Sequence, residues 1–110
     1  MAPDALRGHL DALVLSVVED KPLHGYAISH ALAERSGGAL DLPTGTLYPA
    51  LRRLERAGYL ASEWSTVAGR RRRTYRITSA GRRSLGTARS DWRDFAATIE
   101  GVLRPGLVRG

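Results

Sequence analysis

Apolar side chains recur at helical spacing through residues 43–60 of the chain. Leu47, Leu51 and Leu54 are separated by four and three residues, which places all three on one face of a helix. Gly58 follows them and is typical of a residue that ends a helix. The pattern predicts a short helix with an apolar back, around which the rest of the chain is organised.

Pro49 bears on where this helix begins. Proline is tolerated within the first helical turn, where its missing N–H would have had no partner. This favours Thr46 over Thr44 as the capping residue. The face away from the leucines is cationic and carries Arg52, Arg53 and Arg56.

Two further helices are predicted upstream. Residues 5–19 place their leucines and valines on one stripe, and the segment 20–22 breaks the pattern. His24 opens the second helix, where we expect it to make a local hydrogen bond, and Tyr26 is expected to pack against the central helix. Glycines 37–38 end it. Three helices with short connections, the third cationic, are typical of a helix-turn-helix arrangement.

After the central helix the period changes to that of a strand. Residues 59–65 and 74–78 alternate between apolar and polar positions. Between them stands a glycine turn followed by four consecutive arginines, Arg70, Arg71, Arg72 and Arg73. Two strands joined by a basic tip predict the wing of a winged helix. Because a lone hairpin is marginal in water, it must pack on the helices, with Trp64 and Tyr75 as the expected anchors.

A longer helix is predicted from Ser79, its expected cap, to residue 104. Its apolar positions are separated alternately by three and four residues, and they are Leu85, Ala88, Trp92, Phe95, Ile99 and Val102. This seam is long enough to pair with another helix but too short for a free coiled coil. It exceeds what a small winged helix needs for its own core, so it predicts a homodimer interface.

The net charge of +6 is concentrated in the middle of the chain. Residues 41–83 carry ten basic and three acidic side chains, a net charge of +7, against −2 for residues 1–40 and +1 for residues 84–110. Such a concentration favours a polyanion, because each neutralised phosphate releases condensed counterions. An anionic membrane would attract the same charge. The arginines, however, lie beside leucines at core spacing, so nucleic acid is the expected partner and a membrane is not.

Several classes of function find little support. The absence of cysteine removes disulfides, thiolate catalysis and cysteine-ligated zinc. No apolar run approaches the ~20 residues that span a bilayer, and we find no signal peptide. The three histidines lack a nearby carboxylate cluster, so neither a metal nor another cofactor is expected. Without a nucleophile–base constellation or a phosphate-binding glycine loop, the chain is predicted to be a cytoplasmic protein and not an enzyme.

Four segments together are similar to a known family. In chain order they read LRGHLDALVL, PLHGYAI, GTLYPALRRLERAGYLASEW and GRRRRTYRITSAGRRSL. In this order and spacing they closely resemble the PadR family of transcriptional regulators, over roughly residues 6–103. The short single C-terminal helix is similar to the smaller PadR subfamily, in which that helix mediates dimerisation. The resemblance implies a bacterial or archaeal homodimer that represses promoters and is released by a small molecule.

The residue pattern and the resemblance indicate the same DNA-binding surface. The leading end of the central helix would enter the major groove, where an arginine contacts backbone oxygens or grips a guanine. The arginine run would reach the adjacent minor groove or its phosphates. The predicted DNA-binding residues are Thr44, Thr46, Tyr48, Arg52, Arg53, Arg70, Arg71, Arg72 and Arg73.

Trp92 has two interpretations. In the multidrug-responsive members that the sequence resembles, planar aromatic ligands lie between dimer-related tryptophans of the last helix, and Trp92 is on the corresponding seam. A planar aromatic or phenolic effector would then contact Trp92, Phe95 and Val14. Alternatively, Trp92 is dimer core. The sequence leaves both interpretations open.

The expected fold is mainly α with a small β-hairpin. It consists of a winged helix-turn-helix DNA-binding domain over residues 1–78, a dimerisation helix over residues 79–104 and a flexible tail over residues 105–110. The expected function is that of a ligand-responsive repressor that binds an inverted repeat in double-stranded DNA. Two alternatives remain: a non-specific architectural or RNA-binding protein, and a protein-interaction module that binds DNA weakly.

Overall fold

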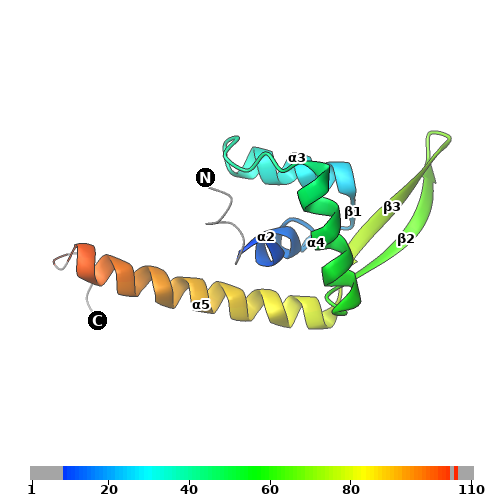
Figure 1. The fold of residues 1–110 in the computed structure, drawn as a ribbon. Coiled ribbons are helices and arrows are strands. Elements are labelled where there is room, and N and C mark those ends of the chain that lie inside the picture. Colours follow the sequence, from blue (N-terminus) through cyan, green and yellow to red (C-terminus); the bar gives the residue numbers. More distant parts are fainter. Residues whose placement is uncertain (1–8, 105, 107–110) are drawn as a thin grey trace.

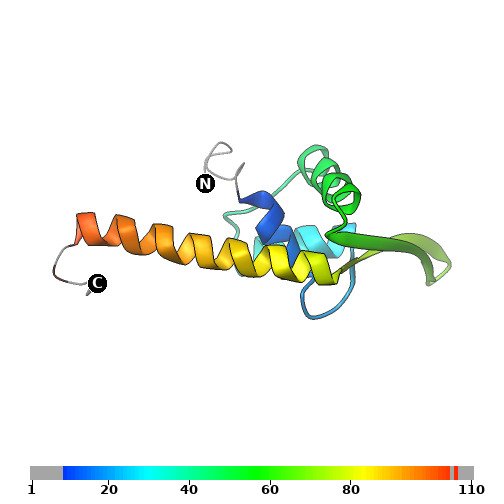
Figure 2. The same cartoon turned by 90° about the horizontal axis from the view of Figure 1, so that it is seen from below.

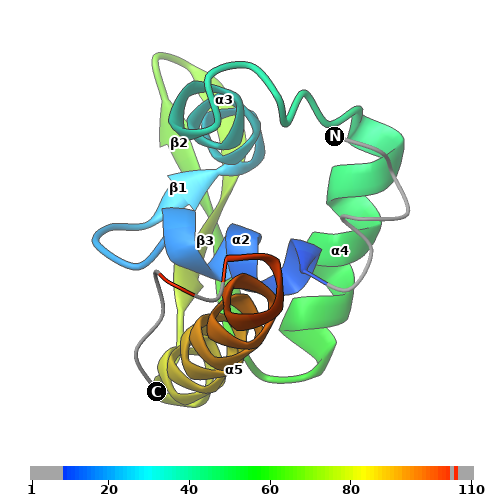
Figure 3. The ribbon, with the colours of Figure 1, turned by 90° about the vertical axis from the view of Figure 1, so that its left-hand side faces the viewer.

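The computed structural model describes residues 9–104 and 106. Within them it contains four helices, α2 (Leu10–Val17), α3 (Gly25–Arg35), α4 (Thr44–Arg56) and α5 (Ser79–Leu103), and three strands, β1 (Leu23–His24), β2 (Leu60–Val67) and β3 (Arg70–Ile77) (Figure 1). The strands form one antiparallel sheet in the order β1-β3-β2. Helix α2 lies at the centre, with α4 on one side and the sheet on the other (Figure 3). This is the predicted winged helix, mainly α with a small hairpin.

The first predicted helix is shorter than expected at its C-terminal end. Residues 5–8 lie outside the described part of the chain, and α2 ends at Val17 although the sequence pattern suggested residue 19. The backbone leaves helical geometry at Val18, and the Glu19 N–H donates to the Ser16 carbonyl in a turn. Strand β1, which follows, was not predicted: two residues are too few to show an alternation.

Helix α4 begins three residues earlier than predicted, which corrects the assignment of Thr46 as its cap. The N-cap position is Pro43, whose carbonyl accepts hydrogen bonds from the Thr46 and Leu47 N–H groups, both at 3.0 Å. Pro49 therefore lies inside the helix. The carbonyl that proline leaves without its helical donor belongs to Gly45, which is exposed and open to solvent.

The end of α4 is as predicted. Gly58 takes a φ of 82°, in the left-handed region that glycine enters at little cost. Its N–H donates to the backbone carbonyl of Glu55 at 3.0 Å, and the Tyr59 N–H donates to the backbone carbonyl of Leu54 at 2.9 Å. These two bonds form a Schellman motif, which satisfies the last carbonyls of the helix and turns the chain into β2.

The strands of the hairpin are longer than predicted, and of the loop expected between them only Ala68 and Gly69 remain as the turn. Ala68 and Gly69 both have positive φ, 53° and 78°, as a two-residue hairpin turn with matching twist requires. Val67 then pairs with Arg70, and the register continues to Leu60 opposite Ile77. The four arginines are consequently residues of β3, not of the tip. Since side chains alternate between faces along a strand, they point in two directions.

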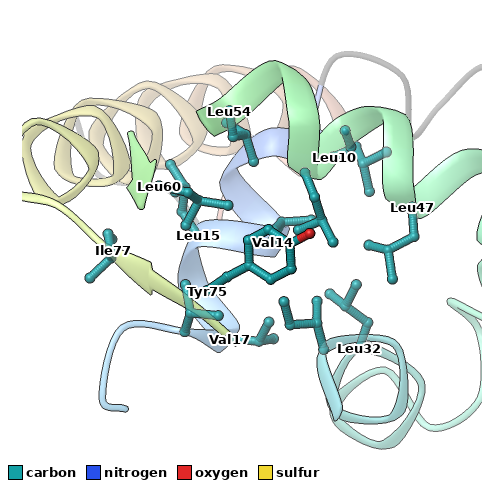
Figure 4. Packing of buried hydrophobic residues seen from close by; sticks show 14 of the residues in the cluster. Leu10, Val14, Leu15, Val17, Leu32, Leu47, Leu54, Leu60, Tyr75 and Ile77 are labelled. Atoms are coloured by element: carbon teal, nitrogen blue, oxygen red, sulfur yellow. The ribbon is translucent and has the colours of Figure 1, made fainter. Parts of the chain in front are cut away.

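The core is formed by α2, the inner faces of α3 and α4, the base of the sheet and the start of α5 (Figure 4). The leucines of α4 are buried as predicted, and so is Tyr75. Trp64, expected as the second anchor of the hairpin, is 55% exposed. It lies opposite Arg73, further out than the Leu60–Ile77 pair that packs in the core, so the strand has left the core before it reaches Trp64.

Helix α5 is capped by Thr78, not by Ser79. The Thr78 hydroxyl oxygen accepts from the Gly81 N–H at 3.0 Å, and the hydroxyl O–H donates to the Gly58 carbonyl at 2.6 Å, which connects α5 to the end of α4. The helix then extends beyond the others (Figure 2), so the molecule measures 58 × 28 × 21 Å. Among the helices described here, none has the length and apolar character needed to cross a membrane.

Leu85 is a core residue, which corrects its predicted role in the dimer interface. It is 2% exposed and belongs to the cluster of buried side chains around α2. It stands in the first third of α5, the part of the helix that packs against its own chain. The seam available to a partner therefore begins after Leu85.

Candidate nucleic-acid interface

The exposed surface of α4 divides into three rows. At about 100° per residue, the row opposite the buried leucines contains Arg52 and Arg56. One flank, toward α2, carries Thr46 and Arg53. The other flank, toward the hairpin, carries Thr44 and Tyr48; all six side chains are exposed. The predicted contacts from α4 thus occupy different sides of the helix.

Arg53 is engaged within the chain. Its guanidinium forms an ion pair with the Asp11 carboxylate of α2 at 2.5 Å. This hydrogen bond holds the pKa of Arg53 above its ordinary value. A contact between Arg53 and DNA would have to replace or share this pair, whereas Arg52, one position earlier, points away from it.

Arg73 is also tied to its own fold. It donates to the Ser62 hydroxyl at 2.8 Å and forms an ion pair with Glu55 at 3.2 Å, which joins the hairpin to α4. The Ser62 hydroxyl donates in turn to Glu55, and this bond, followed by the contact with Arg73, lowers the pKa of the Glu55 carboxyl. Arg73 therefore fixes the angle between hairpin and helix.

Trp64 holds two of the arginines in place. The guanidinium carbons of Arg71 and Arg73 lie 5.3 and 5.7 Å from the centre of its ring. Cations at this distance are attracted by the negative face of an indole. The exposed tryptophan thus stacks with the arginines of its own face of the hairpin, which accounts for its position outside the core.

A groove of about 690 Å³ lies between the hairpin, α4 and the start of α3. Its walls bring together most of the predicted DNA-binding residues, namely Tyr48, Arg52, Arg70, Arg71, Arg72 and Arg73. They also include His24, Tyr26 and Trp64, which the sequence analysis did not assign to the interface. Thr44, Thr46 and Arg53 are not part of this groove.

The observed position of Tyr26 contradicts its predicted role. It was expected to pack against α4, but it is 75% exposed and stacks on His24 at 6.4 Å between ring centres. The buried residues of α3 are Gly25, Ile28 and Leu32, and Tyr26 lies off that face. In the sequence, Tyr26 was marked only by its position beside the start of the helix, and this position does not determine where its side chain points.

Tyr48 lies against the start of α3 because residue 25 is glycine. A Cβ at Gly25 would stand 2.7 Å from the Tyr48 hydroxyl oxygen, closer than van der Waals contact allows. This close approach places the tyrosine in the groove between α3 and α4. Among residues 9–104 and 106, no three His, Asp or Glu side chains are grouped closely enough to hold a metal ion.

The seam on α5 is exposed beyond Leu85. Trp92 is 54% and Phe95 is 55% exposed, and Ile99 and Val102 are exposed as well. Trp92 contacts Phe95 at 5.7 Å and the ring of His9 at 5.3 Å between centres. Val14, predicted beside them as a ligand contact, is instead completely buried in the core of its own chain.

Comparisons with known proteins agree on one family. The model of the transcriptional regulator PadR-like family matches residues 14–87. A Mycobacterium tuberculosis protein named transcriptional regulator Rv3488 is 38% identical over 88 residues, 80% of this chain and 79% of the relative. The crystal structure of a PadR family transcriptional regulator from Eggerthella lenta has a TM-score of 0.80 and 36% identity, and the match covers 92% of this chain and 87% of that one.

A transcriptional regulator from Clostridium thermocellum is similar over 91% of this chain and 95% of its own, with a TM-score of 0.83 and 29% identity. Its likeness extends over both the winged helix and the long last helix. The sequence segments, the fold and these relatives lead to the same conclusion. The chain belongs to the PadR-like family of transcriptional regulators.

Proposed function

We propose that this regulator binds double-stranded DNA sequence-specifically, as a homodimer on an inverted repeat. The observation that supports this most directly is the groove between α4 and the hairpin, where Arg52 and the four consecutive arginines at the start of β3 line the walls together with exposed aromatic rings. Arginine is suited to this role because its planar fork can contact phosphates and guanine edges alike.

In the proposed complex, the outer row of α4 faces the major groove. Arg52 stands at its centre, with Tyr48 and Thr44 on the flank nearest the hairpin. The hairpin would then follow the DNA toward the adjacent minor groove, where arginines suit a narrow, negative channel. Thr46 and Arg53, on the α2 flank, would contact the backbone on the other side of α4.

The proposed dimer is formed by the exposed seam of α5. Trp92, Phe95 and Ile99 present a row of apolar side chains, each about half exposed. A two-fold dimer would place two copies of α4 on half-sites separated by whole helical turns of DNA. A planar aromatic or phenolic effector would bind between the paired Trp92 rings and release a repressed promoter.

Selection of duplexes from a random pool tests this function. The winner and a scrambled duplex are then compared by fluorescence anisotropy across a salt series. A palindromic winner favoured by ~1,000-fold or more is the result expected of a specific dimeric regulator. Equal binding of the two duplexes would contradict the proposal and leave a non-specific architectural nucleic-acid-binding protein.

Two matched variants locate the interface. Arg52→Ala removes one positive charge from the groove, and Arg83→Ala removes one from the exposed surface of α5 outside the groove. Arg52→Ala should weaken binding, and if Arg52 reads a base it should also relax specificity at one position by about 1–3 kcal/mol. Arg83→Ala should leave both unchanged. Equal losses in the two variants would mean that only overall charge matters.

The role of Trp92 is tested separately by sedimentation and by titration with a planar aromatic dye. Trp92→Ala should abolish dye binding if the ring is an effector platform. If the variant dissociates the dimer but still binds the dye, the stacking hypothesis is wrong and Trp92 is dimer core.

A further inference from the structure

The imidazole of His24 lies between two hydrogen-bond donors. Its Nδ1 accepts from the backbone N–H of Ala27 at 3.3 Å, which caps the start of α3. Its Nε2 lies 3.0 Å from a guanidinium nitrogen of Arg72 on β3. His24 thus stands at the junction of α3 and the hairpin, inside the wall of the groove.

These two contacts compete for one lone pair. A neutral imidazole has a single acceptor nitrogen, and an arginine can only donate. If Nδ1 accepts from Ala27, then Nε2 carries the proton and points it at Arg72. If Nε2 accepts from Arg72, the Ala27 N–H loses its acceptor. In either tautomer, one of the two donors has no acceptor at His24.

The surroundings offer Arg72 no carboxylate. Glu55, the acid in the wall of the groove, is bound to Arg73 and Ser62 on the other face of the hairpin. Arg72 lies on the face that it shares with Thr74, the residue paired with His24 across β1 and β3. Among the described residues, no ion pair includes Arg72. Its half-buried guanidinium therefore lines the groove without a carboxylate partner among the described residues.

We propose that a phosphate of the DNA backbone binds at this junction and is the acceptor for Arg72. The phosphate oxygen would take the guanidinium hydrogen bond, which leaves His24 free to cap α3 through Ala27. His24 is then a positioning residue: it holds the start of α3 and presents Arg72 to the phosphate. This inference rests on the proposed DNA binding and assigns to Arg72 a backbone contact, distinct from base reading by α4.

A carboxylate introduced at position 24 by substitution tests the proposal. In His24→Asp, one carboxylate oxygen can cap Ala27, a favoured role of aspartate, and the other can bind Arg72 in place of the phosphate. We expect the affinity for the selected duplex to fall roughly tenfold at 0.1 M salt, and the salt slope to decrease by about 0.9, the value of one phosphate. His24→Asn, a neutral cap that offers Arg72 no carboxylate, should have a salt slope about 0.9 steeper than that of His24→Asp.

Arg72 itself supplies the matched measurement. Arg72→Ala should lower the salt slope by the same ~0.9. Arg76→Ala, which removes an exposed arginine of β3 outside the groove, should not lower it. In the His24→Asp background, Arg72→Ala should cause no further loss, because the contact is already occupied.

The outcomes separate this inference from the function on which it rests. If the wild-type protein selects a palindrome and Arg72→Ala has the slope of Arg76→Ala, the phosphate contact is wrong and the proposed function stands. If His24→Asp binds as the wild type does, the proposed competition at Arg72 is wrong. If the wild-type protein binds no duplex, both proposals fail together.

Discussion

Arg89 of α5 donates two parallel hydrogen bonds to the carboxylate of Glu19, both at 2.9 Å. Two turns earlier on the same helix, Arg82 donates to the Glu19 backbone carbonyl at 3.0 Å. Glu19 lies in the turn that follows α2. One residue of the winged helix thus fixes the direction of the helix that carries the exposed seam.

The Glu19–Arg89 pair should stabilise the fold only slightly, and only above acidic pH. The hydrogen bond from Arg89 lowers the pKa of the Glu19 carboxyl. A lowered folded-state pKa gives stability that is present above the unfolded value of ~4.3 and is lost as pH falls through the folded value. Both side chains are partly exposed, so Glu19→Gln should lower the free energy of unfolding by at most about 1 kcal/mol at pH 7.

Urea denaturation of the wild type and Glu19→Gln at pH 7 and pH 3 checks this expectation. The difference should shrink as the pH falls through the folded-state pKa of Glu19, because a protonated Glu19 resembles glutamine. A difference that stays constant with pH would mean that the charge of Glu19 contributes nothing.

Two glycines of α5 should respond oppositely to the same substitution. A Cβ at Gly81 would stand 2.2 Å from the Tyr59 carbonyl oxygen, whereas a Cβ at Gly86 meets nothing within 4 Å. Gly81→Ala should therefore destabilise by about 1–3 kcal/mol or more. Gly86→Ala should stabilise by about 0.5–1 kcal/mol, since alanine loses less backbone entropy in a helix.

Thermal unfolding of both glycine variants at one protein concentration is the measurement. The pair is matched, because each adds one methyl group to the same helix. If Gly81→Ala is as stable as Gly86→Ala, the contact between the start of α5 and Tyr59 is looser than described.

Alanine substitutions at Leu85 and Phe95 should distinguish a core residue from a residue of the proposed dimer interface. Leu85 is buried in its own chain, so Leu85→Ala should cost about 2–5 kcal/mol of stability at every protein concentration. Phe95 is half exposed, so Phe95→Ala should act through the proposed dimer. Its effect on the unfolding temperature should depend on protein concentration, and sedimentation should show dissociation. A concentration-independent effect of Phe95→Ala would argue against Phe95 as an interface residue.

The helices were predictable because their signals repeat. The leucines of α4 and the glycine after it each point to the same element, and both predictions are confirmed. The precise start of α4 was not predicted correctly, because it was inferred from a single residue. Pro49 lies inside the helix, whereas the rule that proline belongs in the first turn placed the start of the helix closer to it. Local rules predict the existence of an element better than its first residue.

The hairpin shows where alternation stops being informative. The period of two correctly placed Leu60 and Trp64 on one face, but only the tertiary structure decides where along that face the core ends. The arginines were expected at the tip because they directly follow the glycine turn and the second strand was predicted to begin only at Thr74. Ala68 also has a positive φ, a conformation that alanine adopts rarely, so nothing in the sequence indicated a two-residue turn.

His24 should make stability depend on pH just below neutrality. Burial, and then the charge of Arg72, lower the pKa of His24. The unfolded chain therefore binds a proton more readily than the folded chain, and stability is present above the unfolded value of ~6.5 and is lost as pH falls through the folded value. The physical reason is that a protonated imidazole cannot accept from the Ala27 N–H and is repelled by Arg72.

The variant His24→Asn isolates this effect, because asparagine caps α3 without titrating. Between pH 7 and pH 5, the wild type should lose up to about 1 kcal/mol relative to His24→Asn, the usual cost of a lost cap. Every other residue is the same in the two proteins, so the difference isolates position 24. Urea denaturation at half-unit pH steps measures it. Parallel pH profiles of the two proteins would show that His24 does not cap α3 in solution, and the competition at Arg72 would lose its basis.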